Sequence, residues 1–421
     1  MTSSPAKACA LSSDYERALG RKIASGRKRR GLSQKEFAAL LGRSEAWLSQ
    51  VERGVRRIDR MTVLEKVADV MGVPVAELAA EAPLMESPTE DPASGADRLR
   101  LLLSTPHVLK ALVRQARDGA PVDVTALGGE VERAWELVHR GVHAELTELL
   151  EALVPRLESA ARVATGAEQS DVFRLLADTY QAFGAALANM AEPEAAWVAI
   201  DRAVTAAERA GDPLLMAAGA FRLSVVFLGA RRFAQAADVS GSAAEALAHG
   251  EGAEQTERLA LRGALTLQRA LAAARLNLAD DAYAFLRTAR DLAEQVGEGR
   301  NDYNTEFGPA NVSVHEVSVA VGLGDAGVAL RAAKRVDVSV LSEERQARFH
   351  IDLAKAHAQR RQMDDAVSAL LRAQGSAPQL VRSMPSVRQL VADLLLMDRP
   401  PSEALLRLAE ELGVDDPASG N

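Results

Sequence analysis

The sequence feature that most constrains the fold is a pair of amphipathic helices that recurs from Arg98 to about Leu412. The second helix of each pair carries small residues three or four positions apart, which allows two helices to approach closely. Such hairpins leave apolar faces that only a neighbouring hairpin can cover, so they stack into a solenoid. The pattern is seen at Glu194–Ala206, Phe233–Ala237, Asp280–Ala284 and Met363–Val367.

Turn signals separate these helices and set the repeat length. The pairs follow one another at roughly 40 residues, a little more than the ~34 of a tetratricopeptide repeat but within reach of that class. We therefore expect an all-α fold with a tetratricopeptide-like α-solenoid over residues 98–413 and a concave inner surface; an irregular helical bundle is the alternative. The strongest turn signals are Ala210–Asp212, His249–Gly250, Gly297–Gly299 and Gly322–Asp325, and weaker ones lie near Gly229, Asn277 and Arg361.

The composition agrees with packed helices, and the charge is unevenly distributed. Aromatic residues make up only 4% of the 421 residues and hydrophobic residues 48%, which suits close-packed helices better than sheets. The net charge is −8, yet residues 14–69 hold fourteen lysines and arginines against eight acidic residues, and residues 70–421 hold thirty-five against fifty. This asymmetry is expected when one domain meets phosphate and the other does not.

Residues Glu81–Asp97 hold three prolines, two serines and five acidic residues without an apolar period, which predicts a flexible linker. Cys9 is the only cysteine, so no disulfide framework is expected. No stretch reaches the ~18 uninterrupted apolar residues of a membrane span, and the first residues lack the apolar core of a signal peptide. We expect a soluble, cytoplasmic protein without a membrane partner.

The sharpest local pattern runs from Leu32 to Gly54. Ser33 and Glu36 form a capping box at the start of one helix, and Gly42 stops that helix where a tight turn must follow. Ser44 caps the next helix. Two short helices joined by a glycine-containing turn are typical of a helix-turn-helix, so residues 15–80 are expected to form a DNA-binding domain.

The same stretch resembles the phage-repressor-like (XRE) family of helix-turn-helix regulators. The resemblance rests on Gly31–Gln34 (GLSQ) and Leu48–Gly54 (LSQVERG), and it extends from Leu19 to Leu78. It implies a five-helix lambda-repressor-like domain. One departure is Gly26, where the family has a large apolar residue, and this glycine predicts a first helix that is loosely packed or kinked.

The resemblance also implies which side chains meet DNA. Gln34 is implied to grip a phosphate with help from the helix N-terminus, and Arg27 and Glu52 to form an ion pair between the first and third helices. Gln50 is the best candidate for a base contact, because its amide can bond adenine N6 and N7 together. The expected DNA-binding residues are Gln34, Arg43, Ser44, Glu45, Ala46, Trp47, Gln50, Arg53, Arg56 and Arg57.

Several of these residues have an ordinary alternative. Trp47 is equally suited to touching sugar-phosphate and to packing at the domain edge. Glu45 either accepts from cytosine N4 or contributes nothing to binding, because phosphates repel it. Arg56, Arg57 and Arg60 are either solvated surface or phosphate contacts.

The sequence contains no recognisable catalytic constellation. It lacks a nucleotide-binding loop, a nucleophile elbow and cysteine pairs for zinc, so we expect neither an enzyme nor a cofactor. His139 and His143 are spaced four apart with Glu136 nearby, which is compatible with a metal site on one helical face. Because a third clear ligand is missing, we expect them on a wet helix face and predict no metal.

A polar and aromatic stretch at Asn301–His315 interrupts the alanine- and leucine-rich helices. Pro309 suits the first turn of the following helix, which places Asn311 and His315 on one face. On a concave surface these groups suit an amide-rich or oxygen-rich ligand; the alternative is a loop followed by an ordinary helix. The candidate ligand-binding residues are Tyr180, Arg222, Tyr303, Asn304, Phe307, Asn311 and His315.

The whole arrangement is similar to two groups of regulators. One is the peptide-sensing quorum regulators, whose repeats bind a short signalling peptide, and this resemblance is architectural only. The other is a set of actinobacterial regulators that share the arginine-rich head and an FGPxNVxxH stretch, present here at Phe307–His315.

These observations lead to one expected function and one alternative. We expect a sequence-specific transcription regulator that binds double-stranded DNA as a homodimer, on an inverted-repeat operator. A small-molecule or peptide signal bound in the repeats is expected to control it, and the repeats are expected to dimerise. The alternative is a DNA-tethered adaptor whose repeats bind a partner protein.

Overall fold

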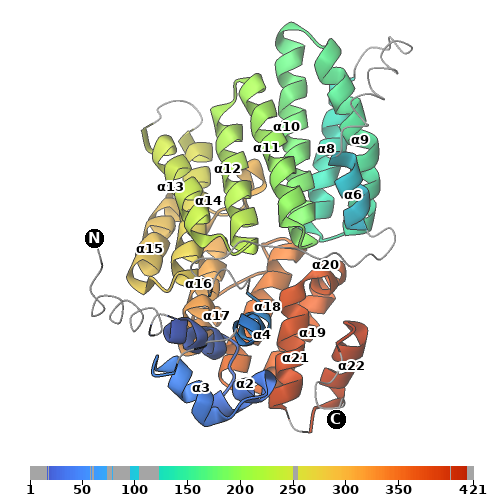
Figure 1. Cartoon of the computed structure of the whole chain (residues 1–421). Helices are drawn as coiled ribbons and strands as arrows, with labels where there is room; N and C mark the ends of the chain where they lie inside the picture. Colours follow the sequence, from blue (N-terminus) through green and yellow to red (C-terminus); the bar gives the residue numbers. More distant parts are fainter. Residues whose placement is uncertain are drawn as a thin grey trace, which may run out of the picture.

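A computed structural model describes residues 17, 19–56, 58, 61–73, 78, 95–103, 123–249, 255–398 and 400–414. This part of the chain contains helices and turns but no strand, which confirms the expected all-α class. A small N-terminal head packs against one end of a large body of stacked helices (Figure 1).

The head brings four helices together within the described residues. The first covers residues 19–29, and it is followed by α2 (Gln34–Leu41), α3 (Glu45–Glu52) and α4 (Met61–Met71). The fifth helix expected from the resemblance falls on residues 74–80, of which only Leu78 is described. The apolar sides of the helices meet in one core, which includes Ile23, Phe37, Leu48, Val51 and Val67.

The body is a succession of helical hairpins. It opens with α6 (Gly95–Leu103), α8 (Val124–His139) and α9 (His143–Val163), and it closes with α20 (Pro378–Ser383), α21 (Pro385–Met397) and α22 (Glu403–Glu411). Two short 3-10 helices are η1 (Leu247–His249) and η2 (Asp302–Asn304). The hairpins between them are α10 (Gly166–Asn189) with α11 (Pro193–Ala210), α12 (Pro213–Gly229) with α13 (Phe233–Ala246), α14 (Gln255–Arg275) with α15 (Ala279–Val296), α16 (Pro309–Leu323) with α17 (Ala326–Ala333), and α18 (Glu343–Gln359) with α19 (Met363–Ser376).

Each of these hairpins packs on the next one along the chain, so the expected architecture of a head followed by helical repeats is confirmed. The turns between the helices lie where the sequence signals them. Helix α11 ends before Gly211 (φ 68) and α16 before Gly324 (φ 84). None of the helices in the described residues is both long and apolar enough to cross a membrane.

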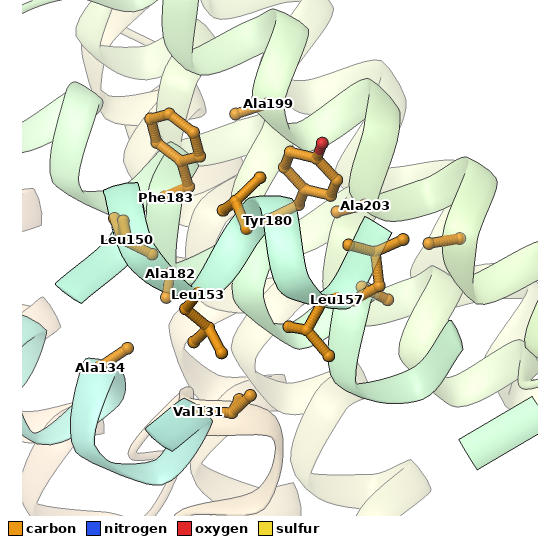
Figure 2. Packing of buried hydrophobic residues seen from close by; sticks show 14 of the residues in the cluster. Val131, Ala134, Leu150, Leu153, Leu157, Tyr180, Ala182, Phe183, Ala199 and Ala203 are labelled. Atoms are coloured by element: carbon orange, nitrogen blue, oxygen red, sulfur yellow. The ribbon is translucent and has the colours of Figure 1, made fainter. Parts of the chain in front are cut away.

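Small residues set the distance between neighbouring helices. A Cβ on Gly184 of α10 would lie 2.3 Å from the Cδ1 of Ile200 in α11, so only glycine allows this contact. Figure 2 shows the same principle nearby, where Tyr180 and Phe183 lie close to Ala199 and Ala203. Because alanine and glycine occupy the seam, the large side chains of α9 and α10 fill the space between the layers.

The solenoid turns far enough for its first repeats to touch its last ones (Figure 1). The Oε1 of Gln379, at the start of α20, accepts from the backbone N–H of His143 at 2.8 Å. Asn189 at the end of α10 accepts from the Nη2 of Arg348 in α18 at 2.7 Å and, through its backbone carbonyl, from the Oγ of Ser383 at 2.9 Å. These polar contacts close the superhelix on itself and enclose its inner side.

The head is docked on the second half of the body through the end of its first helix. The guanidinium of Arg30 forms a bidentate ion pair with Asp393 of α21, whose side chain is only 2% exposed. Arg29 donates to the carbonyl of Arg275 at the end of α14, at 3.2 Å. Gly31 lies so close to the Ala358 carbonyl that a Cβ on Gly31 would be 2.6 Å from the oxygen.

A second set of contacts reaches the start of α2. Arg361, in the turn after α18, donates to the carboxylate of Glu36. Burial would raise the pKa of Glu36, but Arg361 together with Ser33 outweighs it and holds that pKa below its ordinary value. The Nε2 of Gln359 also donates to the backbone carbonyl of Arg29 at 2.9 Å. The orientation of the head is thus fixed by polar contacts on two of its helices.

Substitution of Gly263 tests how tightly the body is packed around Phe307. A Cβ on Gly263 would lie 2.0 Å from the Cζ of Phe307, a fully buried ring. We expect Gly263→Ala to lower the free energy of unfolding by about 1–3 kcal/mol, because overpacking displaces that ring. In the control, Gly241→Ala in α13, the new Cβ meets only the flexible Arg269 at 3.6 Å, so helix propensity should maintain or raise stability. Equal thermal unfolding midpoints for the two variants would contradict this packing.

Candidate functional site

Helices α2 and α3 of the head are joined and capped as the sequence predicts. The Oγ of Ser33 accepts from the N–H of Glu36, and the Glu36 carboxylate accepts from the N–H of Ser33, which completes the capping box. Gly42 ends α2 in the left-handed conformation at φ 64. Ser44 caps α3 by accepting from the N–H of Trp47 at 3.2 Å. The turn therefore places α3 across α2 with its first residues exposed.

The predicted ion pair between the first and third helices is confirmed, and it includes a third residue. Glu52 accepts from Arg27 through both carboxylate oxygens, at 2.6 and 3.0 Å, and from the Nε2 of Gln34 at 2.7 Å. Arg27 also donates to the carbonyl of Leu32 at 2.8 Å. This network holds Gln34, the residue implied to grip a phosphate, at the N-terminus of α2.

The outward face of α3 borders a hollow of about 450 Å³. The Arg43 guanidinium lies over the Trp47 ring, 5.7 Å from its centroid, and the Nη1 of Arg56 is 3.5 Å from the Oε1 of Gln50. Cations and amides around an open hollow suit the edges and phosphates of a duplex. The lining residues are Gly42, Arg43, Ser44, Ala46, Trp47, Gln50 and Arg56, so six of the expected DNA-binding residues come together here.

The other expected DNA-binding residues have different positions. Glu45 is fully exposed at the start of α3, and Arg53 caps its end, with its Nε donating to the Ser49 carbonyl at 3.2 Å. Trp47 is half-buried and packs against the core of the head while bordering the hollow. Arg57, and Arg60 beyond it, lie outside the described residues.

The prediction of a loose or kinked first helix at Gly26 is wrong. Residues 19–29 form one continuous helix. A Cβ on Gly26 would lie 2.5 Å from the Cε of Met71. The methionine at the end of α4 therefore fills the space that a large side chain at position 26 would take.

The polar stretch at residues 301–315 is held firmly against the inner side of the body. Arg222 of α12 donates to the carbonyl of Asn304 at 2.6 Å, and the amide of Asn311 donates to the carbonyl of Glu306 at 2.9 Å. Helix α16 begins at Pro309, as predicted, and the Nδ1 of His315 is 2.9 Å from the Asn311 carbonyl. Tyr303, Asn304 and Glu306 all adopt positive φ, a strained conformation that surrounding contacts must maintain.

Two of the seven candidate ligand residues lie elsewhere. Tyr180 is buried among α9, α10 and α11, where its hydroxyl bonds to Glu158 at 2.5 Å and to Arg202 at 3.3 Å. Burial and the nearby Glu158 carboxylate raise the pKa of Tyr180. Phe307 is a core residue against Gly263. The structure brings together the other five, Arg222, Tyr303, Asn304, Asn311 and His315.

Arg222, Asn311 and His315 belong to a larger and mostly buried group, here called the inner polar cluster. Its members come from both ends of the solenoid, because the closure places α8 beside α18. The Arg222 guanidinium lies 4.6 Å from the centroid of the Trp135 ring, and the ring centroids of Trp135 and His139 are 5.8 Å apart. The cluster consists of Trp135, His139, His143, Arg222, Asn311, His315, Glu344, Arg345 and Arg348.

Several buried atoms of the inner polar cluster have no hydrogen-bond partner among the described residues. They are Trp135 Nε1, His139 Nε2, His143 Nε2, Arg222 Nε, Asn311 Oδ1 and Arg345 Nε. Buried polar atoms are nearly always bonded in native proteins, and an unpaired one costs about 1–3 kcal/mol. Six such atoms belong to the inner polar cluster, where bound water or a ligand would complete the hydrogen bonds.

Burial controls the ionisation of the cluster. It lowers the pKa of His143 and of His315 to about 4, helped at His315 by Arg345. Burial and the neighbouring Arg345 also lower the pKa of Arg222 to about 9. Burial opposes ionisation of Glu344, but Arg348 and Arg345 outweigh it and hold the pKa of Glu344 at about 2. Near neutral pH the histidines are thus uncharged and the ion pairs intact.

His139 and His143 do not share a helix, so the prediction of one wet helical face is wrong. Helix α8 ends at His139 and α9 begins at His143, because Gly141 (φ 66) turns the chain between them. Both histidines face the enclosed side of the solenoid. In the described residues no three histidine, cysteine or acidic side chains are grouped as metal ligands.

Comparison with known proteins agrees with the geometry of the head. Residues 18–80 match a family described as a helix-turn-helix domain. The head is a helix-turn-helix domain. Among curated proteins there is no match to the chain.

One solved structure that resembles the chain is described as Bacillus thuringiensis PlcR in complex with the peptide PapR7 and DNA. The match covers 82% of this chain and 98% of that one, with 11% sequence identity and a TM-score of 0.33. This similarity is too low to transfer the ligands of PlcR to this chain.

Glu52→Ala tests whether the Arg27–Glu52–Gln34 network holds the helix-turn-helix together. The Arg27 and Glu52 side chains are 10% and 6% exposed, so removal of the carboxylate leaves a buried guanidinium without its partner. We expect a loss of about 3–5 kcal/mol in the stability of the head. Amide hydrogen exchange of α2 and α3 should then be faster by two orders of magnitude or more. Glu45→Ala, which removes an exposed carboxylate from the same helix, should exchange like the wild type; similar exchange in both variants would rule out this role.

Proposed function

We propose that the chain is a sequence-specific DNA-binding transcription regulator that acts as a homodimer. We also propose that a small-molecule or peptide signal bound in its helical repeats controls it. The observation that carries the DNA-binding part is the free outer face of α3. Six expected contact residues border one hollow there, while the body is docked on the end of the first helix and the start of α2.

The chemistry of this surface suits a major groove. An α-helix fits the groove, and amide and guanidinium groups read base edges while nearby cations meet phosphate. Gln50, Arg43 and Arg56 all border the hollow beside α3, and the Nη1 of Arg56 is 3.5 Å from the Oε1 of Gln50. We propose that Gln50 reads a base and that Arg43, Arg53 and Arg56 contact the backbone.

Dimerisation follows from the small size of one head. A single helix-turn-helix makes few contacts, so two heads that read half-sites about 34 Å apart, or a multiple of a turn, supply useful affinity. An inverted-repeat operator matches the two-fold symmetry of such a dimer. We further propose that the chain belongs to the XRE family, in its actinobacterial group, and acts in the cytoplasm.

The inner polar cluster supports the signal-binding part of the proposal. Its unpaired donors, Trp135 Nε1 and Arg222 Nε, and its unpaired acceptor, Asn311 Oδ1, are buried between the two ends of the solenoid. A ligand with both acceptor and donor groups would complete these bonds. Because the cluster joins repeats from both ends, such a ligand favours one curvature of the solenoid over another.

A change of curvature reaches the head directly. Arg29 is bonded to the end of α14 and Arg30 to α21, so movement between these helices reorients the head. In a dimer, that rotation alters the spacing of the two α3 helices on DNA. The effect is limited to the difference in ligand affinity between the two shapes of the body.

Selection of DNA by the full chain tests the first part of the proposal. From a random-sequence library we expect enrichment of an inverted repeat. Gln50→Ala should bind that sequence about 5- to 150-fold more weakly, the loss of one bidentate base contact, with less discrimination at one base pair. Arg53→Ala should weaken binding to all sequences and reduce the slope of log affinity against log salt by about 0.9.

The matched controls are Gln169→Ala and Arg287→Ala, which remove the same groups from exposed positions on the body. These variants should bind like the wild type. If no sequence is enriched, or if all four variants bind alike, the chain is not a regulator of the proposed kind.

Native mass spectrometry of the protein purified from its own host tests the second part. We expect a bound small molecule or peptide that Arg222→Met loses, because that variant removes the buried guanidinium from the inner polar cluster. Arg202→Met, which replaces a guanidinium beside Tyr180 on the other side of α10, should retain it. A stoichiometric protein in place of the small ligand contradicts the proposal and favours a DNA-tethered adaptor.

A further inference from the structure

A second hollow, of about 460 Å³, lies between α17 and α18 on the body. Its polar rim comes from α17 and from the turn after α18, the turn that also contacts the head. The lining includes Arg331, Lys334, His357, Arg360 and Gln362 over a floor that contains Leu330 and Leu353. We call these residues the basic hollow.

The cations of the basic hollow are unpaired within the described part of the chain. Arg331, Lys334 and Arg360 are exposed, and no carboxylate among the described residues forms an ion pair with them. Two acidic residues lie close in sequence to this lining: Asp325 accepts from the Tyr283 hydroxyl, and Asp365 lies 3.7 Å from the Nδ1 of His357, itself a residue of the hollow. In a body with far more acidic than basic residues, this concentration of free positive charge is unusual.

Two of these cations converge although they repel each other. Nη1 of Arg360 and Nη1 of Arg331 both lie within 3.5 Å of the point that a Cβ on Gly327 would occupy. Like charges this close favour an anion between them, which neutralises both at once. The absence of a side chain at Gly327 leaves the approach to the two guanidinium groups open.

The basic hollow has a fixed position beside the head. Arg360 is followed directly by Arg361, which is bonded to Glu36 in the first turn of α2. Gln34, the proposed phosphate contact, begins the same turn. A backbone phosphate bound at the N-terminus of α2 would therefore lie near the turn at residues 360–362.

We propose that the basic hollow binds the phosphate backbone of the DNA that flanks the half-site read by α3. This inference rests on the proposed DNA binding and adds a second contact surface, on the body instead of the head. Non-specific backbone contacts of this kind increase affinity and fix the register of a protein on the duplex without reading sequence. With these contacts the body, and not the head alone, is bound to the DNA in a defined position.

A duplex suits the site better than a small anion. The three cations are exposed: Arg331 lies in α17, Lys334 directly follows that helix, and Arg360 directly follows α18. In water a single small anion gains little from such solvated charges, whereas a polyanion releases counterions at each contact.

The test compares two duplexes that contain the sequence selected by the wild-type chain, one trimmed to that sequence and one extended by about a helical turn of random DNA at each end. The variant R331Q/K334Q/R360Q should bind the extended duplex on the order of ten-fold more weakly, with a salt slope smaller by about 2 to 3. Its affinity for the trimmed duplex should equal that of the wild type. The control R140Q/R287Q/R372Q removes three exposed arginines from other parts of the body and should bind both duplexes like the wild type.

Each other outcome overturns the inference. If the basic-hollow variant and the wild type bind the extended duplex equally, no flanking contact exists. If the variant loses affinity for both duplexes alike, the contact lies within the half-site. Competition by millimolar inorganic phosphate that is abolished in the variant identifies a small-anion site. A wild-type chain that binds neither duplex overturns the proposed function as well.

Discussion

The structure depends on one constraint: each helical hairpin of the body has apolar surface that only the next hairpin can cover. Alanine and glycine along the seams, such as Gly184 against Ile200, allow the backbones to approach and rotate each hairpin slightly against its neighbour. Summed over the chain, these rotations bring α18 next to α8. They also bring α20 next to the start of α9 and the end of α10. The inner face of the solenoid is buried as a result, and it must then satisfy buried charge as well as apolar area.

Enclosure changes the chemistry of the side chains inside. Glu344, Arg345 and Arg348 would be solvated residues on an isolated α18, but in the closed solenoid they are only partly exposed and lie near Arg222 and three histidines. Interactions between charges are stronger there and unpaired groups are costlier. The same closure that stabilises the repeats thus creates the inner polar cluster by placing α8 beside α18. The head is held to the same body by Arg30 and Asp393.

Local features were predictable from the sequence because they depend on neighbours along the chain. The capping box at Ser33, the turn at Gly42 and the repeat boundaries at Gly211 and Gly324 all follow from backbone conformation. The Arg27–Glu52 pair was implied by the resemblance. Features set by distant residues were not predictable: nothing near Gly26 indicates that Met71 covers it, and nothing near Asp393 or Glu344 indicates a partner hundreds of residues away or an enclosing superhelix. Tyr180 and Phe307 were expected to bind a ligand, yet their surroundings in the fold make them core residues.

The docking of the head also bears on how such a protein can change over evolution. A small DNA-binding domain is commonly treated as a portable unit that joins any partner through a linker. Here three consecutive residues of the head contact the body. Arg29 donates to a carbonyl of α14, Arg30 pairs with a carboxylate of α21, and Gly31 lies against the backbone at Ala358. A head exchanged for another without these residues leaves Asp393 as a buried charge with no arginine. We therefore expect head and repeats to be inherited as one unit, and a shuffled combination to be viable only if both surfaces are exchanged together.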